Sequence, residues 1–136
     1  MTHWSDMNLW TMDDIPWHQF DPSRVDPDLV KLVKAASLVE NNANIYADYM
    51  GNVFHQYPDL QNLTRVWAGE EVRHGETMAR GATLADPDFN FEEAVKQFRN
   101  NFQVPIEQSS SVRGSLSGEL LARCVVETGT SSHYTA

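Results

Sequence analysis

The chain has 136 residues, of which 41% are hydrophobic and 21% are charged, as in ordinary globular proteins. This length allows one domain with a substantial core, and the composition excludes an intrinsically disordered chain. The formal net charge of -9 excludes a general nucleic-acid binder, which needs a basic face.

The cysteine content and the apolar runs bear on where the protein works. Cys124 is the only cysteine, which excludes an intramolecular disulfide and a cysteine-based metal site. No apolar run approaches the roughly 20 residues that a membrane span needs, and the N-terminus does not resemble a signal peptide. We therefore expect a cytoplasmic protein without a membrane span.

The N-terminal region, residues 1–26, is predicted to be an irregular arm. Its aromatic residues alternate with Asp, Pro and other polar residues: Trp4, Trp10, Trp17 and Phe20. We expect this arm to lie on the surface of a helical body, residues 27–136, with its aromatic side chains packed inward. Packing alone explains these side chains, and no chemistry is assigned to them.

A long helix is predicted from about Pro27 to Tyr57, capped by Asp26 and closed by Pro58. Its inward positions alternate by four and three residues, which is typical of a helix that faces other helices. They are Leu29, Val33, Ala36, Glu40, Ala43, Ala47, Met50 and Phe54. Glu40 is the one charged member, and its small neighbours leave room for a ligand. If the stripe is rotated by one position, Glu40 is instead a surface charge.

A second helix is predicted from about Asp59 to Leu84, antiparallel to the first because the connection is short. Glu71 and His74 are three residues apart and therefore project from the same face. They interrupt an otherwise apolar stripe of Leu60, Leu63, Trp67 and Met78. Glu70 and Arg73 point away from this stripe and are expected in solvent.

Two further helices are predicted. The first is short, begins with Asn90 and Glu93 as a capping pair, and ends before Pro105. The second begins at about Ser117, after a polar loop, and its stripe is Leu120, Cys124, Glu127, Ser131 and Tyr134. Glu127 is the one charge in that stripe. Alternatively, it is a solvated residue that follows Glu119 and Arg123 at a spacing of four.

Three helical stripes, each interrupted by an acid, predict a metal site. A buried charge is costly unless it is paired, and a bound cation is the simplest partner. A carboxylate site for two irons or manganeses uses one Glu from each of two helices and Glu-x-x-His from each of two others. Glu40, Glu71, His74 and Glu127 supply four of those six ligands in the order single, pair, single. One Glu-x-x-His alone arises often by chance.

Three segments resemble the ligand helices of the ferritin-like di-iron carboxylate proteins, closest to the soluble acyl-carrier-protein desaturases and related ferritin-like oxygenases. They are VENNANIYADYM (39–50), WAGEEVRHG (67–75) and ETGTSSHYTA (127–136). The resemblance implies an all-α, ferritin-like four-helix bundle and iron ligation by Glu40, Glu71, His74 and Glu127, with Glu71 bridging two irons. Manganese is the alternative metal.

The resemblance also implies a role for Thr130, which matches a threonine implicated in oxygen activation or proton delivery. This makes Thr130 the catalytic candidate, although its hydroxyl can equally bond a carbonyl of its own helix. The family continues into a fourth helix with a second Glu-x-x-His, whereas this sequence ends at Ala136. We therefore expect a bundle truncated after the third ligand-bearing helix and completed by a homodimer or by a complementing C-terminal chain.

The expected function is that of a di-iron oxidase or oxygenase, which uses dioxygen to desaturate or hydroxylate an organic substrate. A small molecule or an acyl group is the expected substrate. Two alternatives remain open at this point. One is an iron-handling ferroxidase, in which iron itself is the substrate, and the other is a helical remnant that has lost its metal.

Overall fold

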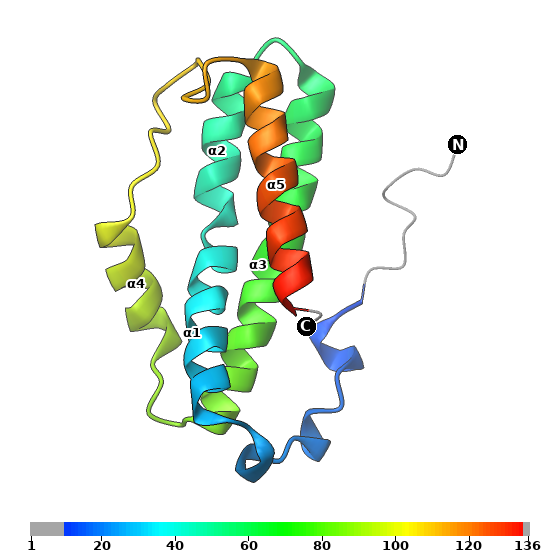
Figure 1. Ribbon diagram of the computed structural model, residues 1–136, viewed down its shortest axis with the longest axis vertical. Coiled ribbons are helices and arrows are strands. Elements are labelled where there is room, and N and C mark those ends of the chain that lie inside the picture. Colours follow the sequence, from blue (N-terminus) through cyan, green and yellow to red (C-terminus); the bar gives the residue numbers. More distant parts are fainter. Residues whose placement is uncertain (1–9, 135–136) are drawn as a thin grey trace. The chain divides into compact units, whose positions relative to one another are not determined.

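A computed structural model of the protein describes residues 10–134, without the side chains of residues 133 and 134 (Figure 1). The described residues contain α-helices, short 3-10 turns and no strand, so the predicted all-α class is confirmed. The α-helices are α1 (Pro27–Asn41), α2 (Ala43–Val53), α3 (Pro58–Ala85), α4 (Phe91–Asn101) and α5 (Leu116–Tyr134). Among the described helices, none is both long and apolar enough to cross a membrane. The ferritin-like bundle type stays a prediction.

The chain divides into two compact units, and two of its helices link them covalently. In its described part, unit 1 comprises residues 10–43 and 69–102, which hold the N-terminal arm, α1, most of α3 and α4. Unit 2 comprises residues 44–68 and 103–134, with nearly all of α2, the first part of α3 and α5. The metal-site prediction therefore has to be assessed within each unit.

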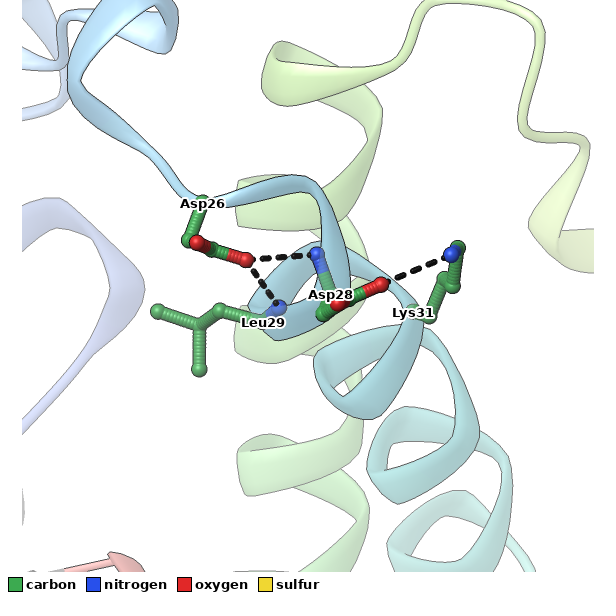
Figure 2. A network of polar contacts seen from close by, with 4 residues as sticks. All are labelled: Asp26, Asp28, Leu29 and Lys31. Carbon is green, nitrogen blue, oxygen red and sulfur yellow. Dashed lines mark hydrogen bonds and ion pairs between the residues drawn. The ribbon is translucent and has the colours of Figure 1, made fainter.

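The arm enters α1 through three 3-10 turns, Met12–Asp14, Trp17–Gln19 and Pro22–Arg24, coloured blue in Figure 1. Helix α1 then begins as predicted: the Asp26 carboxylate accepts hydrogen bonds from the backbone N–H groups of Asp28 and Leu29, and Pro27 occupies the first position (Figure 2). Lys31 pairs with Asp28 at 2.7 Å, but both side chains are highly exposed, so this ion pair contributes little.

The single helix predicted from Pro27 to Tyr57 is wrong, because Asn42 separates α1 from α2 and α2 ends at Val53. Three asparagines lie within residues 41–44, and asparagine competes with the helical backbone for hydrogen bonds. Arg99 of α4 donates to the backbone oxygen and to Oδ1 of Asn41, which places a positive charge at the end of α1. Pro58 begins α3 instead of closing the preceding helix.

The buried face of α3 is rotated by one residue from the predicted stripe. Its most buried residues are small, namely Thr64, Ala68, Gly75, Ala79 and Ala82. The predicted core residue Leu63 is 49% exposed. Small side chains let another helix approach closely, whereas a stripe chosen by hydrophobicity favours the large residues beside them. As a result, Glu71 and His74 lie at the edge of the buried face, not at its centre.

The stripe predicted for α5 is also rotated. Leu120, Cys124 and Ser131 are exposed, whereas Glu119 is completely buried. In unit 2, an apolar cluster of Tyr49, Met50, Val53 and Phe54 packs against Leu60, Trp67, Val104 and Leu116. Glu119 enters this region because the hydroxyls of Tyr46, Tyr49 and Ser111 donate to its carboxylate, each at 2.7–2.8 Å. These hydrogen bonds satisfy a charge that would otherwise be costly to bury.

Candidate metal centre

Three of the predicted ligands come together in unit 1. Glu40 near the end of α1, and Glu71 and His74 on α3, each offer one ligand atom, and these atoms all lie within 4.8 Å of one another. Glu71 and His74 follow Glu40 by 31 and 34 positions in the sequence, so only the packing of α1 on α3 brings them to Glu40. The inward orientation predicted for Glu40 is confirmed, since this residue is only 7% exposed.

Gly75 explains how the two helices come close enough. A Cβ built on this residue would lie 2.6 Å from the backbone nitrogen of Asn41 and 2.8 Å from the backbone oxygen of Ser37. Any side chain at this position would therefore push α1 away from α3. Ser37 and Asn41 flank Glu40 along α1, and Gly75 directly follows His74, so the contact lies beside the three candidate ligands.

The donor set is compatible with a metal ion. Ligand atoms about 2.1 Å from a metal lie about 3–4.2 Å from one another, so three atoms within 4.8 Å need only small side-chain adjustments to share one ion. In the present arrangement, Nδ1 of His74 is 3.7 Å from Oε1 of Glu71. Two carboxylates with one imidazole suit iron, manganese and zinc better than they suit soft metals such as Cu(I).

The charges around His74 favour its protonated form. The carboxylate of Glu71 raises the pKa of His74, and this effect exceeds that of burial, which lowers it. The negative charges of Glu40 and Glu70 raise the pKa of His74 further. An environment that stabilises a protonated imidazole also favours a bound cation, for which the proton must leave.

The other two predicted site residues belong to unit 2. Glu127 is a partly buried residue of α5 in unit 2. Its role as a ligand stays a prediction. The hydroxyl of Thr130 donates to the backbone oxygens of Val126 and Glu127, each at 3.1 Å. Thr130 therefore bonds carbonyls of its own helix, as the alternative to a catalytic role predicted.

Two residues beside the candidate centre have roles that the sequence did not predict. Arg73 was expected in solvent but is partly buried, and its Nη1 donates to the backbone oxygen of Trp10 at 3.3 Å. The indole of Trp10 stacks on the imidazole of His74, with ring centroids 5.7 Å apart and an interplanar angle of 5°. No local periodicity relates the arm to α3, so no pattern in the sequence could have paired these residues.

Comparisons with protein-family models, with curated proteins and with solved structures found no match for this chain.

Proposed function

We propose that the protein is a non-haem di-iron oxidase, which uses dioxygen to desaturate or hydroxylate an organic substrate. The proposal is supported by one observation above all: the donor atoms of Glu40, Glu71 and His74 converge within 4.8 Å in an all-helical unit. The ferritin-like resemblance of the segments around these residues gives the reaction class. A small organic molecule or an acyl group is the proposed substrate.

The protein's own residues would bind the metal and shape its surroundings. Bound iron would supply the redox chemistry with dioxygen. Glu40 brings a buried carboxylate, and Glu71 a carboxylate that is 12% exposed, so both come from a poorly hydrated environment. His74 is more open, at 39% side-chain exposure, and it must lose its proton before it can ligate.

Anaerobic titration with Fe(II) tests the metal centre. We expect the protein to bind Fe(II) and to melt at a higher temperature when loaded, because a ligand that binds only the folded state stabilises it. Glu40→Gln and His74→Gln should each weaken binding at least about 10–100-fold, the loss typical of removing even an indirect ligand partner. Glu76→Gln makes the same charge change at an exposed position of α3 and should bind as the unaltered protein does.

The variant Glu127→Gln tests the ligand that was predicted from sequence alone. A loss of affinity similar to that of Glu40→Gln would support Glu127 as a ligand. Unchanged affinity and stoichiometry would show that the three residues of unit 1 suffice to bind the metal.

Oxygen consumption then separates the proposed reaction from its alternatives. The oxidase should consume dioxygen repeatedly when an electron donor and an organic substrate are supplied. A single round of consumption, matched to the iron added, together with a large shell in size-exclusion chromatography, would identify an iron-handling protein instead. If neither iron nor manganese binds, the chain is a helical remnant and the proposal is wrong.

A further inference from the structure

The N-terminal arm is attached to α3 at two similar points. The guanidinium of Arg73 lies 5.8 Å from the ring centroid of Trp10, and that of Arg80 lies 4.7 Å from the ring centroid of Trp17. The two tryptophans are seven residues apart in the arm, and the two arginines are seven residues apart on α3, which is two helical turns. Each attachment therefore combines an indole with a cation on the same face of the helix.

The arm between these attachments is internally ordered. Trp17 Nε1 donates to the backbone oxygen of Met12 at 2.8 Å. The backbone N–H and the hydroxyl of Thr11 both donate to Oδ2 of Asp14, which closes a capping box around the first 3-10 turn. Trp10 is thus held at the start of a folded segment, next to the hydrogen bond that its backbone oxygen accepts from Arg73.

Only one of the two attachments reaches the candidate metal centre. Trp10 stacks almost parallel to the imidazole of His74, the most exposed of the three candidate ligands, with the ring centroids 5.7 Å apart. Rotation of the imidazole out of its plane would break this contact. Among the described contacts of the arm, none joins Trp17 to a candidate ligand.

Resting on the proposed function, we propose that Trp10 is a positioning residue of the metal centre. Its indole holds the imidazole of His74 in one plane and limits the approach of water and competing ligands to it. The arm is then part of the metal site, since it fixes the one ligand that the two helices leave open. Binding energy from an aromatic stack of this kind corresponds to an affinity change of about 2–10-fold.

Co(II) is the probe, because it occupies carboxylate and imidazole sites and its visible absorption reports the ligand geometry. Trp10→Ala should weaken Co(II) binding about 2–10-fold, speed its release to a chelator and alter its absorption bands. Trp10→Phe keeps an aromatic ring over His74 and should restore the affinity, the release rate and the spectrum. Tyr57→Ala truncates an exposed aromatic side chain of unit 2, outside the arm, and should leave all three unchanged.

Tryptophan fluorescence gives a second measurement that does not depend on the alanine variant folding well. Co(II) bound by His74 should quench the emission of the adjacent Trp10, and Trp10→Phe should lose that quenching. If Trp10→Ala binds and releases Co(II) as the unaltered protein does, the positioning role is wrong, while the metal centre stands. If the unaltered protein binds no Co(II), the proposed function fails and this inference fails with it.

Discussion

The Glu119 carboxylate accepts three hydrogen bonds inside unit 2, and these contacts govern its protonation. Burial raises the pKa of the Glu119 carboxyl, but the donors Ser111, Tyr49 and Tyr46 together outweigh burial and lower it below its usual value. The reciprocal effect appears at Tyr46, where burial and the hydrogen bond to Glu119 raise the pKa to about 12. The ionised carboxylate and the neutral phenols are therefore the stable combination.

Glu119→Gln should destabilise the protein by about 1–3 kcal/mol at pH 7, because a hydrogen bond to a charged group is worth that much. A carboxyl whose pKa is lower in the folded state stabilises the fold at pH values above its unfolded pKa. This contribution is lost as the pH falls through the folded pKa. The difference in the free energy of unfolding between Glu119→Gln and the unaltered protein should therefore shrink below about pH 4, near the unfolded pKa of a glutamate. Urea denaturation at several pH values measures it.

Glu107→Gln provides the control for this prediction. Glu107 is an exposed residue of the loop before α5, so its substitution removes the same charge without removing a buried acceptor. It should change stability by no more than about 0.5 kcal/mol, as surface substitutions usually do. An equal effect of the two substitutions, or a Glu119→Gln effect that does not depend on pH, would contradict the role assigned to the buried carboxylate.

At the scale of helices, the close approach of α1 and α3 depends on Gly75. Gly75→Ala should lower stability by about 1–3 kcal/mol, because the added methyl group meets backbone atoms that cannot rotate away. Alanine is the better helix former by about 1 kcal/mol, so the steric cost has to exceed this gain. Chemical denaturation of the apoprotein shows directly whether Gly75→Ala lowers or raises the free energy of unfolding. Fe(II) titration should show weaker binding, because the added methyl group separates the two helices.

Gly69→Ala is the matched control on the same helix. A Cβ at Gly69 would meet no atom within 4 Å, so only the helix propensity changes. This variant should be more stable by about 0.5–1 kcal/mol. If both alanine substitutions stabilise the protein, then α1 and α3 tolerate a wider spacing and Gly75 has no special role.

Most helices were predictable from the sequence, whereas the break at Asn42 and the rotations of α3 and α5 were not. Caps at Asp26 and Asn90 mark the starts of α1 and α4, and α3 was predicted to within one residue at each end. The rotations of α3 and α5 follow from tertiary contacts, namely the approach at Gly75 and the hydrogen bonds to Glu119. Hydrophobic periodicity cannot predict either contact, because neither a glycine nor a glutamate contributes to an apolar stripe.

The candidate centre was likewise only partly predictable from the sequence. Acids that interrupt three apolar stripes predicted a shared site for Glu40, Glu71, His74 and Glu127, and the donor atoms of the first three converge. For Glu127 the shared site stays a prediction. The stacking of Trp10 on His74 could not be predicted, since it joins the arm to a helix more than sixty residues away. Contacts of this kind follow from the packed structure and from no local signal.

For the whole molecule, the two units are expected to unfold together. Helix α3 runs unbroken from Pro58 to Ala85 and so contributes to both units, and a chain of this length usually unfolds in one cooperative transition. Metal bound as proposed would contact unit 1 through three ligands, but in a cooperative protein it should stabilise the entire chain. At a free Fe(II) concentration of about 100 times the dissociation constant, the expected gain is about 2.7 kcal/mol.

Differential scanning calorimetry, with and without anaerobic Fe(II), measures this coupling. We expect one transition that moves to higher temperature as a whole and returns on addition of a chelator. The His74→Gln variant, which lacks one ligand, should show a much smaller shift under the same conditions. Two transitions, of which Fe(II) moves only one, would mean that the units fold independently and that α3 does not transmit the stabilisation from unit 1 to unit 2.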